Sequence, residues 1–211
     1  MKLYTYYRSS AAFRVRIALN LKGLAYEPRF VHLAKGEHRK PEYAALNPQG
    51  LVPALAEDDG SLLTQSLAII EYLEEKYPHP PLLPQDARGR ARVRSLALLI
   101  ACEIHPLNNL RTLTHLRKAL GQNEDQVTTW YRHWIADGLA KLESDLGTGA
   151  GRFCHGDSPT IADCCLVPQI FNAKRFNCDL AAYPATMRIF AECMQLDAFQ
   201  RAQPSSQPDA E

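Results

Sequence analysis

Cysteine is missing from the first 101 residues of this 211-residue chain. All six cysteines lie further on, at positions 102, 154, 164, 165, 178 and 193. None of them forms a CxxC pair, so the chain lacks the paired spacing of a zinc site or of a dithiol redox motif. A secretion signal is also lacking, since "MKLYTYY" leads directly into structured sequence. We therefore expect reduced thiols, most of them buried, in a cytoplasmic protein.

Long hydrophobic runs and a dominant charge are also absent. No apolar run reaches the length of about 18 residues that a membrane-spanning helix needs. The 24 Lys and Arg residues nearly balance the 23 Asp and Glu residues, which leaves a net charge of +1. This balance gives no electrostatic basis for binding nucleic acid or an acidic membrane. Any bound anion must therefore be held by local groups.

The first 80 residues contain alternating strand and helix patterns. Hydrophobic residues make up 46% of the chain, which is enough for a core. Residues 2–7 suit a strand, and apolar residues every four positions predict a helix over 11–22 that ends near Gly23. Residues 25–33 suit a second strand, which Pro28 restricts to a sheet edge or a bulge. An Asp-Gly turn within 47–66 predicts a β-hairpin, and a helix follows from Ser66, which can cap its first turn.

After the proline-rich segment "PHPPLLPQDA", the sequence predicts helices alone. Pro106 must kink or end the first of these helices. Thr160 and Asp163 form a capping pattern, which we interpret as a folding element. The fold class is thus an α/β N-terminal domain followed by an all-α C-terminal domain. The boundaries we expect are 1–80 for the first domain, 81–87 for the linker, 88–203 for the helical domain and 204–211 for a disordered tail.

Three short segments suggest anion or peptide binding, and each also has a plain structural explanation. Ser9 and Ser10 precede a helix, where free N–H groups and the helix dipole favour an anion, although Ser10 could simply cap the helix. Pro53 could form a cis peptide bond that presents the backbone of Val52, or it could merely start a strand. Gln65 and Ser66 stand at another helix start, where a carboxylate could bind. Tyr4, Tyr6 and Tyr7 could tempt one toward a catalytic tyrosine, but strand propensity explains them better.

Taken together, "RSSAAFRVRIALNLKG", "LVP", "QSLAIIEYLEE" and "DSPTIADCCLVPQ" resemble the glutathione transferase superfamily, and the resemblance runs from residue 1 to about 200. The first of these motifs resembles the zeta class, which includes maleylacetoacetate isomerase and bacterial glutathione-dependent maleylpyruvate isomerases. "CEIHPLNN" and "AKRF" are most similar to the maleylpyruvate isomerases. The resemblance implies a thioredoxin-like N-terminal domain that binds glutathione, and a two-fold homodimer.

The class signature has a cysteine where this chain has Ala11. Because the reacting sulfur in the class belongs to glutathione, the loss need not abolish activity. It does remove the argument for a protein thiol as the nucleophile. The absence of cysteine from the first half of the chain points the same way, so any sulfur that reacts there is supplied by glutathione.

The resemblance also implies a set of glutathione contacts. Ser9 and Ser10 would hydrogen-bond the glutathione thiolate and Val52 would pair with its cysteinyl backbone, while Gln65 and Ser66 would hold its γ-glutamyl carboxylate. The remaining cofactor contacts expected from the resemblance are Arg14, His38, Gln49, Pro53, His105 and Asn109.

Isomerisation requires a nucleophile that adds to a conjugated cis double bond, so that the bond can rotate before the nucleophile leaves. The substrate is a dicarboxylate keto acid, and negative charge develops on it during addition. Arginine suits planar oxyanions, so we expect Arg8, Arg111 and Arg175 to clamp the substrate together with the catalytic serines.

Two other functions remain open at this point. A glutathione transferase could use the same thiolate to conjugate electrophiles or to remove halide from α-halo acids. A non-catalytic module with this fold could serve as a ligand carrier or subunit contact, although it would have no need of the Ser9–Ser10 pair or of Gln65 and Ser66.

Overall fold

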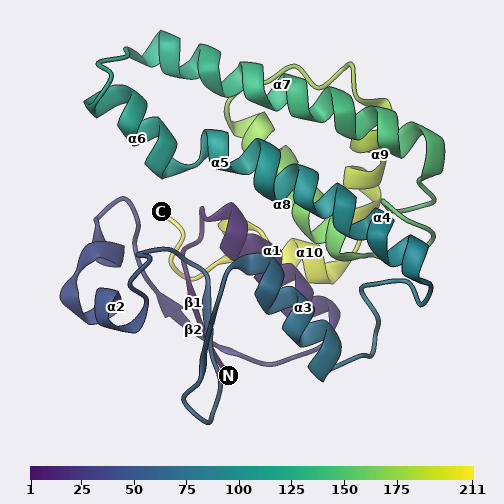
Figure 1. The fold of residues 1–211 in the computed structure, drawn as a ribbon, viewed down its shortest axis with the longest axis horizontal. Coiled ribbons are helices and arrows are strands. Elements are labelled where there is room, and N and C mark those ends of the chain that lie inside the picture. The colour runs from purple at the N-terminus through teal and green to yellow at the C-terminus, as the bar shows by residue number, and fades with distance from the viewer. The chain divides into compact units, whose positions relative to one another are not determined.

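In a computed structural model that describes residues 1–211, the chain divides into two units. One unit consists of Met1–Leu82 together with Met194–Glu211, and the other is Leu83–Cys193 (Figure 1). We call them the sheet unit and the helical unit.

The sheet unit contains a four-stranded sheet in the order β2-β1-β3-β4. Its strands are β1 (Lys2–Thr5), β2 (Glu27–Phe30), β3 (Ala54–Ala56) and β4 (Leu62–Thr64). β1 pairs in parallel with β2 and antiparallel with β3, and β3 forms the predicted hairpin with β4. β2 lies at the edge of the sheet, the place to which Pro28 restricts it.

The sheet unit also contains four α-helices. They are α1 (Ser10–Leu21), α2 (Pro41–Leu46), α3 (Ser66–Lys76) and α10 (Asp197–Ala202). α1 packs against both α3 and α10, and α3 packs against β3 and β4. A buried ion pair fastens α1 to α3, because Lys22 Nζ lies 2.7 Å from Glu74 Oε2 and also donates to the carbonyls of Tyr77 and Pro80.

The end of the chain differs from the sequence prediction. Residues 194–203 belong to the sheet unit, although the sequence suggested a helical domain that continued to residue 203. The segment 204–211, expected to be a disordered tail, contains a 3-10 turn at Pro204–Ser206, and Asp209 Oδ2 accepts a hydrogen bond from Tyr7 N at 3.0 Å. The prediction was wrong because a local composition rich in proline and serine does not reveal a contact with a residue far away in the sequence.

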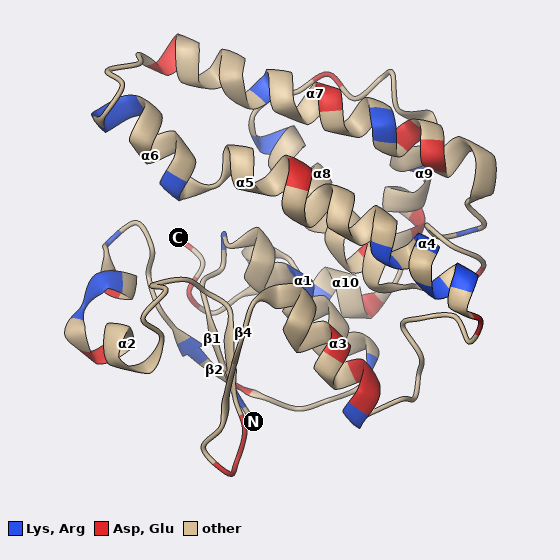
Figure 2. Ribbon diagram, in the orientation of Figure 1, with Lys and Arg blue, Asp and Glu red and all other residues tan.

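The helical unit is built from helices alone. They are α4 (Ala87–Leu98), a π-helical segment (Leu99–Ile104), α5 (His105–Asn108), α6 (Leu110–Lys118), α7 (Glu124–Gly149), α8 (Ile161–Arg175) and α9 (Pro184–Cys193). The π-helical segment ends just before Pro106, where the sequence predicted a kink or an end. None of the helices is both long and apolar enough to cross a membrane. Figure 2 shows basic and acidic residues interspersed along α7.

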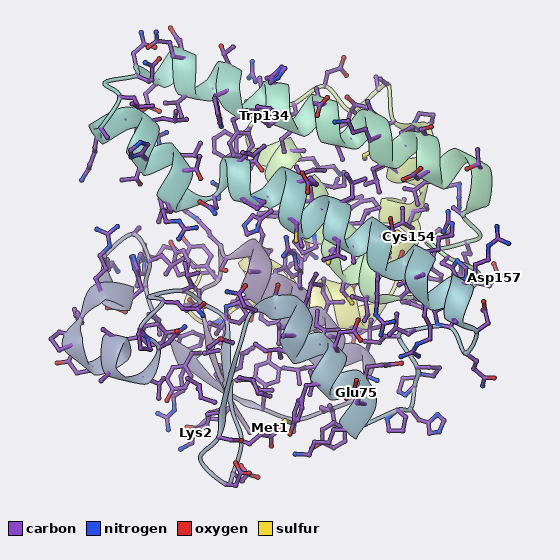
Figure 3. All side chains as sticks on the ribbon, in the orientation of Figure 1. Met1, Lys2, Glu75, Trp134, Cys154 and Asp157 are labelled. Atoms are coloured by element: carbon purple, nitrogen blue, oxygen red, sulfur yellow. The ribbon has the colours of Figure 1, made fainter.

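The cysteines all lie in the helical unit and none forms a disulfide. Cys154, Cys164, Cys165 and Cys193 are buried. Cys154 lies inside the unit in Figure 3. Burial raises the pKa of the Cys154 thiol, which keeps it protonated and unreactive. The sheet unit therefore contains no sulfur nucleophile of its own.

Candidate active site

The turn between β1 and α1 carries the serine pair. Ser9 is the N-cap of α1, and its Oγ accepts a hydrogen bond from Ala12 N at 3.2 Å. Ser10 is the first helical residue, so the alternative in which Ser10 caps the helix is wrong. The turn is tight because Ser9 N donates to the carbonyl of Tyr6 at 2.9 Å.

The start of α1 is electropositive. Its first turn contains no acidic residue, so the free N–H groups there have no carboxylate from their own helix. Arg8 stands directly before the serines with an exposed side chain, and its guanidinium carbon lies 4.9 Å from the centre of the Tyr7 ring. This arrangement favours an anion beside Ser9.

The tyrosines of this turn are buried side chains. Tyr6 and Tyr7 belong to an apolar cluster that also includes Val31, Tyr43 and Val52. Burial raises the pKa of Tyr6 to about 12, and the neighbouring Tyr7 contributes to this shift. Tyr6 therefore stays protonated at neutral pH, in keeping with a packing role.

The loop before β3 presents the backbone of Val52. The carbonyl of Leu51 accepts hydrogen bonds from Tyr43 Oη at 2.6 Å and from Asn47 Nδ2 at 2.8 Å, which fixes the loop. The Val52–Pro53 peptide bond is cis. Val52 lies outside the paired register of β3, which begins at Ala54, and its backbone takes part in none of the turn or loop hydrogen bonds. An extended peptide could add to the chain here as a short strand.

The start of α3 is strained. Gln65 precedes the helix with φ +68°, a backbone conformation that residues other than glycine rarely adopt. Its side chain is held in place, because Gln65 Nε2 donates to Gln49 Oε1 at 2.8 Å. Strain of this kind costs about 1–3 kcal/mol and tends to occur at ligand sites.

Ser66 does not cap α3, contrary to the sequence prediction. The unusual backbone of Gln65 makes Ser66 the first helical residue, and no side-chain cap is present. Ser66 Oγ instead accepts a hydrogen bond from the buried Arg14 Nη1 at 3.2 Å. Like α1, α3 has no acidic residue in its first turn, so its N–H groups also favour an anion.

His38 lies close to Gly50, in the loop before β3. A side chain at Gly50, which has φ +60°, would come within 3.2 Å of the His38 carbonyl oxygen. Burial and the nearby Arg39 lower the pKa of His38. His38 is therefore neutral near pH 7 and can act as a hydrogen-bonding group.

The remaining predicted site residues lie in the helical unit. His105 begins α5, and Asn109 caps α6 by accepting a hydrogen bond from Thr112 N at 3.0 Å. Arg111 and Arg175 are exposed, on the first turn of α6 and the last residue of α8. The Arg175 guanidinium carbon lies 4.9 Å from the centre of the Phe176 ring. Both guanidinium groups are accessible to an anion.

Sequence reasoning missed three residues. Asn108, beside the predicted Asn109, is buried, and neither polar atom of its amide has a partner in the protein. The double asparagine in "CEIHPLNN" was the available signal for it. Arg16 and Asp209, which contact the Tyr6–Ser9 turn, had no local signal.

The sheet unit thus brings together two helix starts suited to anions and one open segment of backbone. This set matches an extended molecule of peptide character that carries anionic groups. No group of three or more His, Cys, Asp or Glu side chains is arranged to hold a metal ion.

Comparison with known protein families gives a match to each unit. Residues 3–81 match the model of the glutathione S-transferase N-terminal domain, and residues 110–191 match that of the C-terminal domain. These matches confirm the predicted fold class.

Individual relatives are similar over the full length. A maleylpyruvate isomerase from a Ralstonia species is 53% identical, with 100% of both chains covered. A holo structure of a maleylpyruvate isomerase, described as a bacterial zeta-class glutathione transferase, is 52% identical, with a TM-score of 0.97 and 100% of both chains covered. A maleylacetoacetate isomerase from Methylobacterium extorquens AM1, solved with malonate and glutathione bound, is 48% identical, again with a TM-score of 0.97 and complete coverage of both chains.

Proposed function

The chain belongs to the glutathione S-transferase family, and on that premise we propose that it is a glutathione-dependent cis–trans isomerase of maleylpyruvate or maleylacetoacetate. The observation that carries this proposal is the start of α1. Ser9 caps a helix with no acid in its first turn, in a unit that contains no cysteine. Such a site stabilises a thiolate but cannot supply one.

The residues present fit glutathione. The starts of α1 and α3 suit its thiolate and its γ-glutamyl carboxylate, and the backbone of Val52 suits its peptide backbone. Bound glutathione supplies the thiolate that adds reversibly to the cis double bond. We assign the thiolate contact to Ser9 and Ser10, and the carboxylate contact to Gln65 and Ser66.

Other residues would support these contacts. Gln49 holds the Gln65 side chain, and Arg14 holds Ser66. Pro53 and His38 shape the loops beside Val52 and Gly50. His105 and Asn109 are proposed as glutathione contacts from the helical unit, on the resemblance alone.

The proposed role of the arginines is to bind the substrate. Both maleyl substrates are dicarboxylates, and addition to the double bond places further negative charge on the keto acid. Arg8, Arg111 and Arg175 carry exposed guanidinium groups that can pair with planar oxyanions. A guanidinium group bound to the keto acid would stabilise the negative charge that develops in the transition state.

The primary test measures conversion of maleylpyruvate and of maleylacetoacetate to the trans isomers by the dialysed full-length protein. We expect no turnover in thiol-free buffer and full turnover after glutathione is added. S-methylglutathione, which lacks a free thiol, is the matched control and should compete with glutathione without supporting turnover. Full activity in thiol-free buffer would overturn the proposal, and the ratio of the two rates identifies the preferred substrate.

A second test separates substrate binding from glutathione binding. Arg8→Ala and Arg111→Ala should lower kcat/KM for the keto acid by roughly 100-fold, since each removes a charged partner of the developing oxyanion. Glutathione affinity should change little. Arg29→Ala, at an exposed arginine paired with Glu27, is the control and should leave both quantities unchanged. Equal losses of isomerisation and glutathione binding would contradict the role assigned to Arg8 and Arg111.

Assembly as a homodimer stays a prediction from the resemblance, and a cytoplasmic location stays a prediction from the sequence. Sedimentation equilibrium of the purified chain would test the first of them.

A further inference from the structure

The turn that carries Ser9 is hydrogen-bonded to the buried side chain of Arg16. Arg16, on α1, is 0% exposed and forms four hydrogen bonds. Its Nη1 donates to Thr5 Oγ1 at 3.0 Å and to the Tyr6 carbonyl at 3.3 Å, and its Nη2 donates to the Tyr7 carbonyl at 3.1 Å. A buried guanidinium group that donates to two consecutive carbonyls, those of Tyr6 and Tyr7, fixes the direction of the Tyr6–Ser9 turn.

The C-terminal segment of the chain is hydrogen-bonded to the same turn. Tyr7 N donates to Asp209 Oδ2 at 3.0 Å. The peptide groups of Tyr7 are therefore held at both polar atoms, the carbonyl by Arg16 and the N–H by Asp209. Two residues further on stands Ser9, which caps α1.

Hydrogen bonds hold the segment that carries Asp209. Arg16 Nε donates to the carbonyl of Ala202 at 3.0 Å, and Asn20 Nδ2 donates to the carbonyl of Ala198 at 2.9 Å. Gln207 Nε2 donates to the carbonyls of Arg201 and Gln203, which folds the last residues back on α10. The segment 194–211 is thus a strap fastened to α1 before it reaches Tyr7.

We propose that Asp209 is a positioning residue for the reaction, which acts through Tyr7 to hold Ser9 and the N–H groups of α1 in place around the glutathione thiolate. Arg16 is the second positioning residue of the same turn. This inference rests on the proposed function. Its physical basis is that hydrogen-bond donors stabilise a thiolate most when they are already aimed at its position, because no free energy is then spent on reorienting them.

The test compares three variants of the full-length protein. Asp209→Ala removes the acceptor of Tyr7 N. Asp209→Asn keeps an oxygen acceptor for Tyr7 N, removes the charge and puts an amide NH2 group in place of Oδ1, the oxygen that has no partner. Asp197→Ala is the matched control, because Asp197 is an aspartate of the same strap that pairs with Arg201 and does not touch the turn.

Four quantities are measured: kcat, the KM for glutathione, the apparent pKa of the glutathione thiol in the binary complex, and the exchange rate of the Tyr7 amide. Asp209→Ala should lower kcat by roughly 10-fold to 100-fold, because small misplacements of catalytic groups have effects of this size. It should also raise the thiol pKa and accelerate exchange at Tyr7. Asp209→Asn should recover most of the loss, and Asp197→Ala should behave as wild type.

Several results would overturn the inference. In one, Asp209→Ala has a wild-type thiol pKa and kcat. In another, Asp209→Asn is as impaired as Asp209→Ala, which would mean that the charge and not the hydrogen bond matters. If Asp209→Ala does not fold, exchange in the wild type decides: the Tyr7 amide must exchange far more slowly than an amide in an unstructured peptide.

Failure of the proposed function gives a different pattern. A wild-type protein that binds glutathione and does not isomerise either keto acid would refute the activity. The thiol pKa and the Tyr7 exchange rate would still report on the strap in that case, because neither depends on turnover.

Discussion

The starts of α1 and α8 both follow a hydroxyl residue, but only α8 has a carboxylate of its own. Asp163, in the first turn of α8, is 0% exposed and accepts hydrogen bonds from Cys154 N, Thr160 N and Thr160 Oγ1. The first turn of α1 contains no acid, and Ser9 provides one neutral acceptor. At the start of α8 the protein supplies the anionic acceptor itself, through Asp163. At the start of α1 it supplies none, so an external anion can bind there.

Other helices extend the comparison. α3, at the second proposed glutathione contact, also lacks an acid in its first turn. α7 has Glu124 and Asp125 at its start, and α9 receives Glu143, which accepts from Ala185 N and Thr186 N. The starts of α7, α8 and α9 thus use the protein's own carboxylates, whereas those of α1 and α3, which are proposed to serve glutathione, do without them. The following predictions test that division.

The largest effect is expected at α8. Asp163→Ala should lower the free energy of unfolding by about 3–5 kcal/mol, because it leaves buried donors of Cys154 and Thr160 without an acceptor. Urea denaturation measures the loss. Asp157→Ala, at a nearby exposed aspartate labelled in Figure 3, is the control and should change stability little. Wild-type stability of Asp163→Ala would show that the carboxylate does not close this helix.

Removing the cap of α1 should act on chemistry more than on stability. Ser9→Ala should raise the pKa of the bound glutathione thiol by about one unit and lower kcat/KM roughly 10-fold to 100-fold, since one donor to the thiolate is lost. Stability should fall by only about 1 kcal/mol, as for other N-caps. The pH dependence of kcat/KM measures the shift. Ser9→Thr, which keeps the hydroxyl, should restore it, and an unchanged pH profile in Ser9→Ala would move the role to Ser10 or to the backbone.

Relieving the strain at α3 should separate binding from stability. Gln65→Gly should stabilise the protein by about 1 kcal/mol, because glycine adopts the positive φ without strain. It should also weaken glutathione binding roughly 10-fold through the loss of one hydrogen bond to a charged group. Calorimetry of glutathione binding and thermal unfolding give the two values. Gln65→Ala keeps the strain and should lose affinity without gaining stability; a gain in both variants would contradict this explanation.

The smallest effect is expected when α1 is given its own carboxylate. Ala11→Asp places an acid in the first turn, which should stabilise the helix by about 0.5 kcal/mol through the dipole. The same charge should repel the thiolate, raise the thiol pKa and weaken glutathione binding a few-fold. Ala11→Asn is the uncharged control. If both variants bind glutathione equally well, the absence of acid from α1 has no functional meaning.

Much of the fold, and the carboxylate cap of α8, could be predicted from the sequence. The Asp-Gly turn predicted the hairpin of β3 and β4, and Pro28 predicted an edge strand. The Thr160–Asp163 pattern predicted the cap of α8, because both partners lie within one turn of a helix. Features of this kind depend on neighbours in the sequence, so local patterns are sufficient to find them.

The features that the sequence did not reveal depend on distant contacts. Ser66 looked like a cap because its type favours one, but the connection from β4 forces Gln65 into the left-handed region instead. The segment 204–211 looked disordered, and only the contact between Asp209 and Tyr7 shows that it is part of the sheet unit. The predicted roles of the site residues stay predictions, since each requires a bound molecule to test it.

The division of the sheet unit between both ends of the chain has a consequence for biosynthesis. A ribosome that has released residues 1–82 has made the sheet, α1 and α3, but not the residues that complete their packing. Until Ala202 and Asp209 emerge, Arg16 Nε lacks its carbonyl acceptor and Tyr7 N lacks its carboxylate acceptor. The Tyr6–Ser9 turn can therefore form all its hydrogen bonds only after translation of the entire helical unit. A nascent chain stalled before residue 194 should expose an incompletely packed N-terminal segment to chaperones and proteases.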